Sequence, residues 1–484
     1  MNKQAIYNYI DQNIDKHTAR VQEWVKQPSV SWDNLGVEDC AKLVARTYKD
    51  LGCSEVDLLE GRFHPGLWAY YDAGATKTIH NYCMFDTRPV ANADKWNYDP
   101  WGGELVQYGD FPKVVVGRGA LGAKGPYVAF LNALEAIIAV EGTLPVNIMF
   151  LAEGEEIMMS PAYKHFVEAY SHRLKEVSAS YCVMGSQSAD GSVPIWLGMK
   201  GMVVLELSAK GANWDKGPST TIHSSAAGLV QNLPIRLSQA LASLVDNGGR
   251  CVVDGLEQIW SYRKSIATDE EALLQGLAQR FKGKDWRNAL PLGGTDNIAE
   301  IVGGMNGMDP LKNYLYGPTM NVSGLRSGFI GMGTHTNPAI SPGVATATID
   351  LRMVVEMPAQ EIIGSIRKHL DSHGFTDIEI DVLADYDFNQ APCSFSSLDA
   401  LKDTLHSWDV EPVVWPLNGG GGPWTAVANA FGVPCIRGGA IGGGGNGPGN
   451  IDEYLVIEGN GKVAGLAESE KYHVDALFNF AASL

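Results

Sequence analysis

The sequence predicts an α/β protein whose mainly parallel sheet is flanked by helices, with a separate α+β domain inserted into it. Continuous apolar runs of strand length alternate with helical periodicity in the first part of the chain and again near its end. Between these parts, the strands alternate apolar and polar residues, as half-exposed antiparallel strands do. With 484 residues, the chain is also too long for one core. We therefore expect residues 1–199 and 391–484 to form one domain and residues 200–390 to form the inserted one.

The elements follow in order from periodicity and from glycine and proline breaks. In the first segment we expect helices at 4–26, 37–52 and near 161–170, strands at 67–73, 78–85, 146–152 and 180–184, an irregular segment at 91–113, and a strand, glycine turn and helix over 114–142. In the inserted domain we expect alternating strands at 201–211, 346–356 and 376–386 and helices at 233–245 and 357–374. After it we expect a helix at 398–408, strands at 413–417 and 433–439, and a helix start at 423–432.

Composition excludes several kinds of partner. The net charge of −18 argues against nucleic acid and anionic membranes. Hydrophobic residues make up 45% and charged residues 19%, and no apolar run is long enough to cross a bilayer. Residues 1–17 form a polar amphipathic helix without the apolar core of a signal peptide, so we expect a cytoplasmic protein. The seven scattered cysteines never form C-x-x-C, which argues against disulfides and zinc knuckles.

The buried strand at 146–152 leads directly into three carboxylates, Glu153, Glu155 and Glu156. Ligands of open α/β sheets bind at the carboxyl ends of strands, so these acids are candidates for chemistry, with a solvated acidic loop as the alternative. Asp86 follows the strand at 78–85 in the same way. Cys83 and Cys182 also lie near strand ends, but no base stands near either one in the sequence.

Glycine-rich stretches offer a second kind of candidate. The G-x-G-x-x-G spacing from Gly117 to Gly122 lacks the acidic residue of a dinucleotide site, and the absence of G-K-[ST] excludes a P-loop. Two runs of four glycines, 419–422 and 442–445, are able to present backbone N–H groups to a carboxylate. Simple turns are the alternative for both runs.

Taken together, the motifs resemble the aminoacylase and carnosinase family of dinuclear zinc exopeptidases, especially its carnosine and Cys-Gly dipeptidase branch. The resemblance covers nearly the whole chain and rests on YCMFDTRP, GRGALGAKGP, FLAEGEEIMMS, TTIHSSAAG, TIDLRMVVE and GNIDEYLVIEG. It implies a zinc-exopeptidase-like fold in which the inserted domain is a dimerisation or lid domain, and hence a homodimer.

The same resemblance marks five direct zinc-ligand positions, and none of them holds a good zinc ligand here. These positions are occupied by Met84, Gly122, Ile157, Met184 and Asn446. Zinc prefers imidazole, thiolate or carboxylate, which thioether, isoleucine and glycine do not replace. Zinc lowers the pKa of its bound water by several units, and a lone glutamate does not supply that help. We therefore expect neither a metal cofactor nor zinc-dependent peptide hydrolysis.

Other positions of the family pattern are kept. The resemblance makes Glu156 the general base, whose pKa we expect the apolar Ile157 and Met158 to raise. It makes His223 an oxyanion-stabilising residue that reaches the partner subunit's site, and Arg352 the residue that grips a substrate carboxylate. The remaining expected substrate-binding residues are Asp86, Asn321, Thr336, Gly420, Gly421, where a serine is usual, and Gly422. As structural alternatives, Arg352 would be a strand-face ion-pair partner, His223 an ordinary polar residue and Glu156 a solvated acid.

Three functions fit these residues. The first is a metal-independent enzyme acting on a small amino-acid-derived or dipeptide-like carboxylate, with Glu156 moving a proton and no cofactor. Hydrolysis of an activated C–N or C–O bond, an elimination or proton abstraction would suit it, and a covalent variant would use Cys83 or Cys182. The second is a non-catalytic pseudo-peptidase that binds a small ligand or partner. The third is a metal-dependent dipeptidase with a site rebuilt from Asp86, Glu155 and Glu156.

Overall fold

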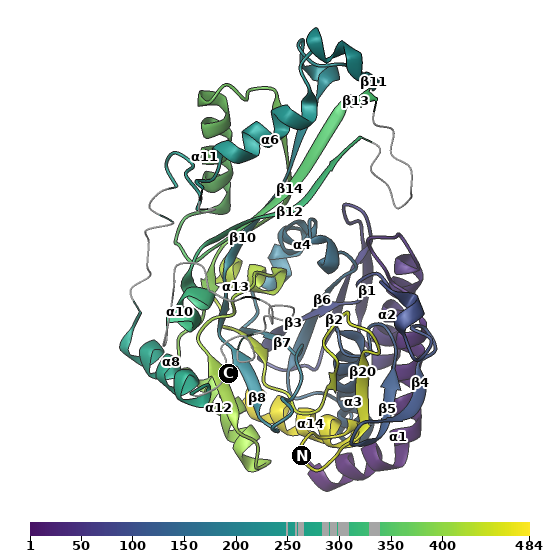
Figure 1. Cartoon of the computed structure of the whole chain (residues 1–484). Coiled ribbons are helices and arrows are strands. Elements are labelled where there is room, and N and C mark those ends of the chain that lie inside the picture. Colours follow the sequence, from purple (N-terminus) through teal and green to yellow (C-terminus); the bar gives the residue numbers. More distant parts are fainter. Residues whose placement is uncertain are drawn as a thin grey trace.

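An eight-stranded sheet in the order β1-β2-β6-β3-β7-β18-β8-β17 organises the first domain (Figure 1). The computed structural model describes residues 1–247, 250–256, 259, 266–282, 290, 298, 309–328 and 339–484. The strands are β1 (Glu55–Leu59), β2 (Gly66–Tyr71), β3 (Thr78–Met84), β6 (Asn147–Glu153), β7 (Ala179–Cys182), β8 (Val193–Trp196), β17 (Pro412–Trp415) and β18 (Cys435–Gly438). Four of the neighbouring pairs are parallel and the other three are antiparallel, so the sheet is mixed with a small majority of parallel pairs.

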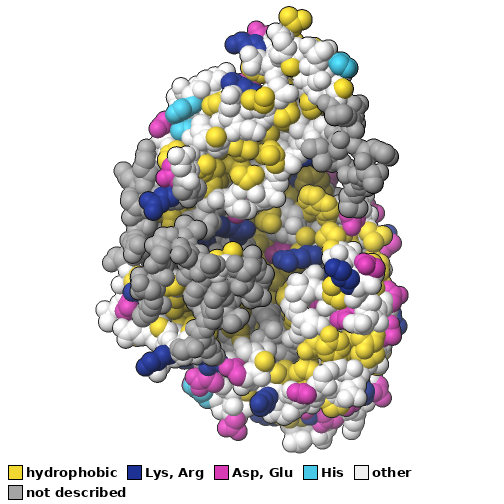
Figure 2. All heavy atoms as spheres, viewed as in Figure 1, with side chains coloured by type: hydrophobic (Ala, Val, Ile, Leu, Met, Phe, Trp, Pro, Cys, Tyr) yellow, Lys and Arg dark blue, Asp and Glu magenta, His cyan; other side chains and the backbone are white. Residues whose placement is uncertain are grey.

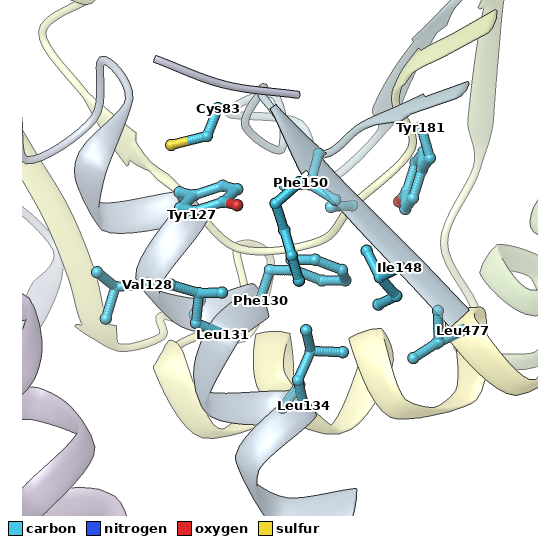
Figure 3. Packing of buried hydrophobic residues seen from close by; sticks show 14 of the residues in the cluster. Cys83, Tyr127, Val128, Phe130, Leu131, Leu134, Ile148, Phe150, Tyr181 and Leu477 are labelled. Carbon is cyan, nitrogen blue, oxygen red and sulfur yellow. The ribbon is translucent and has the colours of Figure 1, made fainter. Parts of the chain in front are cut away.

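Helices cover both faces of this sheet. One face packs against α1 (Lys3–Lys26), α2 (Val37–Leu51), α3 (Lys124–Glu141), α12 (Ser396–Ser407) and α14 (Leu466–Ser483). The other face packs against α4 (Tyr163–Ala169) and α13 (Ala426–Phe431). In the core, Ile148 and Phe150 of β6 contact side chains of α3 and α14 (Figure 3). Because β6 is buried along its whole length, its carboxyl end is held firmly in place.

The predicted helices and strands of the first domain agree with the structure to within a few residues, but β1, β8, α14 and the strand at 454–458 were not predicted. The segment at 91–113, expected to be irregular, contains β4 (Glu104–Tyr108) and part of β5 (Phe111–Val116), which pair as an antiparallel hairpin. The hairpin belongs to a second sheet with the strand order β19-β20-β5-β4. In this sheet β5 pairs with β20 (Tyr454–Glu458), which pairs in turn with β19 (Gly444–Gly445). Its partner strand comes from near the C-terminus, which local sequence patterns do not reveal.

The inserted unit is built on a four-stranded antiparallel sheet in the order β12-β14-β10-β15. Its strands are β12 (Thr319–Ser327), β14 (Val344–Met353), β10 (Gly201–Lys210) and β15 (Ile378–Tyr386), and its helices include α6 (Leu233–Ser243) and α11 (Ala359–Ser372). β14 alternates buried and more exposed residues as expected, but β10, expected to be half-exposed, is buried on both faces. Helices cover one face of β10, and its Met202 and Val204 pack into the first domain's core. The limits 200 and 390 of this unit stay a prediction.

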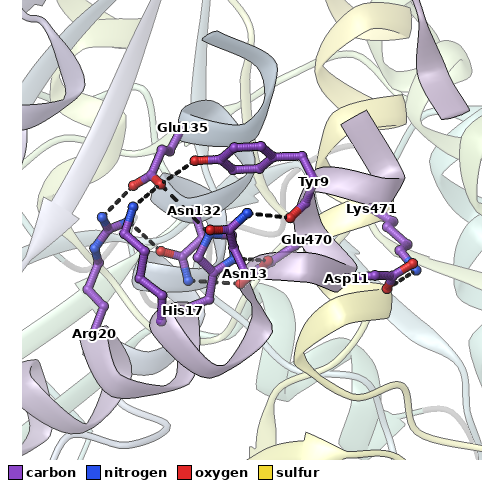
Figure 4. A network of polar contacts seen from close by, with 10 residues as sticks. Tyr9, Asp11, Asn13, His17, Arg20, Asn132, Glu135, Glu470 and Lys471 are labelled. Carbon is purple, nitrogen blue, oxygen red and sulfur yellow. Dashed lines mark hydrogen bonds and ion pairs between the residues drawn. The ribbon is translucent and has the colours of Figure 1, made fainter. Parts of the chain in front are cut away.

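A polar network joins α1, α3 and α14 on the side of the molecule away from the inserted unit (Figures 1 and 4). His17 Nδ1 lies 2.6 Å from a carboxylate oxygen of Glu470, which also accepts a hydrogen bond from Asn132 at 2.8 Å. Arg20 bonds both Asn132 and Glu135. We call His17, Arg20, Asn132, Glu135 and Glu470 the helix network. No described helix is long and apolar enough to cross a membrane.

Candidate functional site

The candidate site lies where β3 and β6 end. These parallel neighbours pair Met84 with Glu153, so Asp86 and Glu156 follow the ends of adjacent strands. Figure 2 shows a hollow between the inserted unit and the first domain, with Lys and Arg side chains at its edges. We call this hollow the cleft. The edge-of-sheet argument from the sequence therefore predicted where the acids meet.

Asp86 is completely buried and lies beneath the short turn that carries Glu156. Its carboxylate accepts hydrogen bonds from the Ser31 hydroxyl at 2.7 Å, the Ile157 N–H at 2.9 Å and the Glu156 N–H at 3.1 Å. Burial raises the pKa of Asp86 to about 6, although these donors favour the charged form. Because its oxygens already bind the turn, Asp86 holds Glu156 in position; its predicted contact with substrate stays a prediction.

Glu156 is partly buried, and its carboxylate accepts no hydrogen bond from any described residue. Burial and the charge of Asp86 raise the pKa of Glu156 to about 7, which is the direction expected from the sequence. The charges of Arg437, Arg88 and Arg352 act in the opposite direction. Glu156 is therefore a carboxyl group that both gives up and accepts a proton near neutral pH.

Two neighbouring acids of the same motif have different surroundings. Glu153 is fully buried; its Oε1 accepts hydrogen bonds from Tyr82 at 2.7 Å and Ser160 at 2.8 Å. Burial raises the pKa of Glu153 well above its ordinary value, which favours the neutral form of this carboxyl. The Glu155 carboxylate instead accepts the backbone N–H groups of Phe63 and His64. Asp86, Glu155 and Glu156 do not bring three ligand atoms within 4.8 Å of one another, so the metal site rebuilt from them stays a prediction.

Two arginines of the cleft were not predicted. The Arg437 guanidinium lies over the rings of Trp196 at 4.7 Å and Trp424 at 5.0 Å, and it forms no ion pair with a described residue. The exposed Arg88 likewise has no ion-pair partner in the described part of the chain. Both are close enough to lower the pKa of Glu156. Arg437 lies on β18, a predicted strand, so the rule about strand ends would have found it had it been applied to cations as well as acids.

Arg352 lies on β14, where its Nε contacts the Asp350 carboxylate at 3.3 Å. Asp350 also accepts hydrogen bonds from Asn321 at 3.0 Å and Ser323 at 2.8 Å. The strand-face ion pair considered for Arg352 is thus present, but it engages only the inner nitrogen of the guanidinium. The outer nitrogens of Arg352 form no hydrogen bond with a described residue, which leaves them able to bind a carboxylate.

The loop at 419–422 packs directly against Arg352. A Cβ at Gly421 would lie 3.2 Å from an Arg352 nitrogen and 2.8 Å from the Met202 Cβ, so the serine usual in the family does not fit here. The Gly420 N–H donates to Asn418, and its carbonyl accepts from the Lys200 N–H. A Cβ at Gly422 would meet the Trp424 ring at 2.3 Å. These glycines permit close packing, while the predicted contact of Gly420, Gly421 and Gly422 with substrate stays a prediction.

Lys200 is a further cation that sequence reasoning missed. Its side chain is almost completely buried, and its Nζ donates to the Gly317 carbonyl at 2.6 Å. Burial and the nearby charge of Arg352 lower the pKa of Lys200 to about 7.

One predicted residue, His223, lies apart from Glu156. His223 is exposed at the end of β11 (Ile222–His223), at the far tip of the inserted unit, where its Nδ1 contacts the Ser225 hydroxyl at 2.9 Å (Figure 1). Within one chain it forms no contact with the cleft acids, so a role for His223 there requires a second subunit. Thr336 lies outside the described residues.

The second glycine run is structural. Gly442 exchanges hydrogen bonds with Gln187, and Gly444 and Gly445 pair with β20. Its backbone groups are therefore engaged within the fold.

The cleft residues do not fit a zinc pair. Met84, Ile157 and Met184 present apolar or thioether side chains, and the Asn446 amide donates to Tyr108 and to the Asp452 carbonyl, both at 2.8 Å. A Cβ at Gly122 would lie 2.5 Å from the Pro448 Cβ, so the place of the bridging aspartate is filled. Among the described residues, no three His, Cys, Asp or Glu side chains of the cleft come close enough to share one ion. This donor set does not hold zinc.

Cys83 and Cys182, the two candidate nucleophiles, are both buried. Burial raises the pKa of Cys182 to about 11 and that of Cys83 well above its ordinary value. Burial therefore disfavours the reactive thiolate form of both, and the covalent variant stays a prediction.

Comparison with known proteins supports the resemblance seen in the sequence. Residues 216–377 match the family profile described as the peptidase dimerisation domain (M20_dimer). The Cys-Gly metallodipeptidase dug1 of Schizosaccharomyces pombe is 22% identical over 391 residues, which cover 76% of each chain. The human Beta-Ala-His dipeptidase is 24% identical over 390 residues, covering 76% of this chain and 71% of that protein.

Solved structures show the same fold. An M20 family metallo-carboxypeptidase from Sulfolobus solfataricus superposes with a TM-score of 0.77 at 24% identity, covering 96% of this chain and 99% of that chain. Human carnosine dipeptidase 1 gives a TM-score of 0.73 at 21% identity, covering 100% of this chain and 99% of that chain. The predicted fold class and the relation to dipeptidases of this group are therefore confirmed. The relatives support a peptidase scaffold and favour the metal-dependent alternative; they do not test the expected loss of zinc.

Proposed function

We propose that this protein is a metal-independent enzyme on a dipeptidase scaffold that acts on a small amino-acid-derived or dipeptide-like carboxylate. The observation that carries the proposal is Glu156, a cleft carboxyl with a pKa of about 7 and no hydrogen-bond donor among the described residues. A group with such a pKa suits general acid–base catalysis at neutral pH. A merely structural acid in this position would be expected to have a partner, as Glu155 has.

The cations around Glu156 support the substrate class. Arg437 and Arg88 are unpaired among the described residues, and the outer nitrogens of Arg352 are not engaged. Guanidinium groups bind carboxylates through two parallel hydrogen bonds, and an unpaired one in a partly buried site gains most from an anionic ligand. In a chain with a net charge of −18, a cleft rich in arginines would draw small anions locally.

The reaction class follows from what the cleft offers. Glu156 supplies one proton transfer, and the guanidinium groups stabilise negative charge that develops on a substrate oxygen. These means suit an activated C–N or C–O bond, an elimination, or proton abstraction beside a carbonyl. They are too weak for an unactivated peptide bond, because the described side chains of the cleft bring no three ligand atoms together for the zinc that would activate water.

We also infer that the protein works as a cytoplasmic homodimer. The match of residues 216–377 to a peptidase dimerisation domain supports the dimer. The position of His223 at the tip of the inserted unit supports a role in the partner subunit's cleft, because this histidine does not reach the cleft of its own chain.

A metal-dependent dipeptidase is the second candidate, because the named relatives include metallodipeptidases. It requires zinc to bind through Asp86 and Glu156 without the family's other ligands. A non-catalytic pseudo-peptidase would keep the arginines for binding and have no use for the unpaired Glu156.

One experiment separates the three. Purified protein is screened with N-acyl amino acids, dipeptides, esters and lactams, with and without a chelator. We expect turnover that the chelator leaves unchanged and that Glu156→Gln lowers by about 10²–10⁴-fold. Glu168→Gln, an exposed acid on α4, is the matched control and should keep full activity. Activity that the chelator abolishes and zinc restores would establish the second candidate, and ligand binding without turnover would establish the pseudo-peptidase.

A further inference from the structure

We propose that the inserted unit carries a separate binding site for a divalent transition-metal ion such as Zn²⁺, formed by Asp254, His369 and His373. One ligand atom from each of these residues lies within 4.8 Å of the others, and among the described residues no other group of three or more His, Cys, Asp or Glu does this. The site lies on α11 and the segment at 250–256, outside the cleft.

His369 is held in the form that binds metals. Its ring is almost completely buried, and Nε2 lies 2.9 Å from the Ser243 carbonyl, which only accepts. The neutral ring therefore carries its proton on Nε2 and a lone pair on Nδ1. Nδ1 lies 3.5 Å from a carboxylate oxygen of Asp254 and receives the Asp254 backbone N–H at 3.2 Å. An ion would replace that long hydrogen bond.

His373 is held in a similar way. Its Nδ1 lies 2.9 Å from the His369 carbonyl, which leaves the lone pair of the neutral ring on Nε2. Metal-binding histidines almost always donate their second nitrogen to a carbonyl, a carboxylate or water, because this fixes the ring and its tautomer. His369 has that supporting contact in the Ser243 carbonyl, whereas the His373 ring would give up its contact with the His369 carbonyl in turning toward a shared ion.

The arrangement needs one adjustment. The rings of His369 and His373 are stacked, with centroids 4.0 Å apart and planes at 25°. A shared ion requires the His373 ring to turn so that its lone pair points at the same place as that of His369. His373 is exposed and has room to turn, whereas His369 is fixed. Asp254, whose side chain is 64% exposed, is equally free to approach.

The ligand set and its position indicate the class of ion. Two imidazoles and one carboxylate, with a fourth position open to water, form a common zinc environment. The histidines follow each other by four positions at the carboxyl end of α11, where the helix dipole favours a cation. A bound ion would fasten the end of α11 to the segment at 250–256. Zinc found in purified protein would then come from the inserted unit and would say nothing about the cleft.

The test uses full-length protein without a histidine tag, stripped of metal. Zn²⁺ binding is measured by calorimetry, and Co²⁺ serves as a probe because tetrahedral sites give it strong visible absorption. We expect about one ion per chain, with affinity weakened at least about tenfold in both His373→Ala and Asp254→Ala. Both side chains are exposed, so the fold should tolerate their loss. His406→Ala, an exposed histidine in the last turn of α12, is the matched control and should bind as the unmodified protein does.

Two outcomes would overturn the proposal. One is the absence of binding at millimolar zinc, and the other is binding that neither His373→Ala nor Asp254→Ala weakens. The second outcome would place the ion elsewhere, including the cleft. Because the readout is binding rather than turnover, the result does not depend on the function proposed for the cleft.

Discussion

Two groups of buried and partly buried acids in the first domain differ in whether they form ion pairs. In the helix network, Glu135 contacts Lys16 and Arg20, and Glu470 contacts His17 (Figure 4). In the cleft, Asp86, Glu153 and Glu156 form no ion pair with any described residue. The acids of the first group join three helices. Those of the second group have no ion-pair partner among the described residues, so a cationic group of a ligand could pair with them. A buried acid without a partner is thus the better indicator of a functional site.

The pKa values of Glu135 and His17 follow the same division, whereas burial raises the pKa of Glu470 even though His17 favours its charged form. Burial disfavours the charged form of Glu135, but His17, Lys16 and Arg20 outweigh it and lower the pKa of Glu135 far below its ordinary value. Burial likewise opposes the charge on His17, and the two nearby carboxylates outweigh it and raise the pKa of His17. In the cleft, burial prevails and raises the pKa of Asp86 to about 6 and of Glu156 to about 7.

The same substitution in both groups gives the sharpest contrast. Glu470→Gln should lower the free energy of unfolding by about 3 kcal/mol at neutral pH, because it leaves buried His17 without its charged partner. Glu153→Gln should change it by less than about 1 kcal/mol, because burial favours the neutral form of Glu153 and an amide oxygen still accepts from Tyr82 and Ser160. Urea denaturation measures both.

Lys471→Ala is the control for the helix side of this comparison. Lys471 pairs with the exposed Asp11 at the edge of the same helices, and its loss should cost under about 1 kcal/mol. Equal losses for Glu470→Gln and Glu153→Gln would contradict the distinction between the two groups of acids.

Adding a fourth acid to the cleft tests whether the zinc site is closed. Gly122→Asp should lower stability by about 1–3 kcal/mol, because its side chain must displace Pro448. Gly228→Asp, where a Cβ would have no neighbour within 4 Å, should have little effect. Thermal unfolding with and without zinc measures both variants. A stable Gly122→Asp protein that gains zinc affinity in the cleft would show that the place of the bridging aspartate is still open.

Removing a cation from the cleft tests whether the cleft binds a carboxylate ligand. Arg437→Met should weaken binding of a carboxylate ligand found in the screen by about 10–100-fold, because charge-assisted hydrogen bonds are lost. The pKa of Glu156 should also rise, since Arg437 lowers it. Arg46→Met, an exposed arginine on α2 that pairs with Glu23, should change neither quantity. Calorimetry measures the affinity, and the pH dependence of turnover measures the pKa of Glu156. Unchanged affinity in Arg437→Met would mean that Arg437 does not bind the ligand.

Sequence reasoning placed the acids correctly because β6 is a continuous apolar run that ends abruptly in Glu153. The rule that ligands bind at strand ends needs no knowledge of distant contacts. The hairpin of β4 and β5 escaped prediction because its stability comes from β20, far away in sequence. The alternating pattern of β10 predicted one solvent-exposed face, but the first domain covers that face. This contact also joins residues far apart in sequence.

Within the site, residue types were predictable but orientations were not. Glu155 and Glu156 are adjacent, yet one carboxylate fixes a loop and the other enters the cleft, a difference set by the turn between them. Arg437 stands in a predicted strand, but only packing against Trp196 and Trp424 shows that its charge lies in the site. Those contacts join β18 to β8 and to the loop after the first glycine run, which no local pattern brings together.

The remaining expected effect of Glu156 concerns stability and not activity. Glu156 has an ordinary pKa of 4.5 and a pKa of about 7 in the folded protein, so between these values the unfolded chain holds fewer protons than the folded one. Stability must then fall as pH rises through this range and stay lower above it.

Glu156→Gln removes that loss. The variant should be as stable as the unmodified protein near about pH 4 and more stable by about 1–3 kcal/mol near pH 8. Urea denaturation at the two pH values measures the difference, with Glu168→Gln unchanged at both. A gain in stability that is the same at both pH values would mean that folding does not raise the pKa of Glu156. A gain confined to high pH, together with lost turnover, is expected where an unpaired carboxyl is retained for chemistry at the expense of stability.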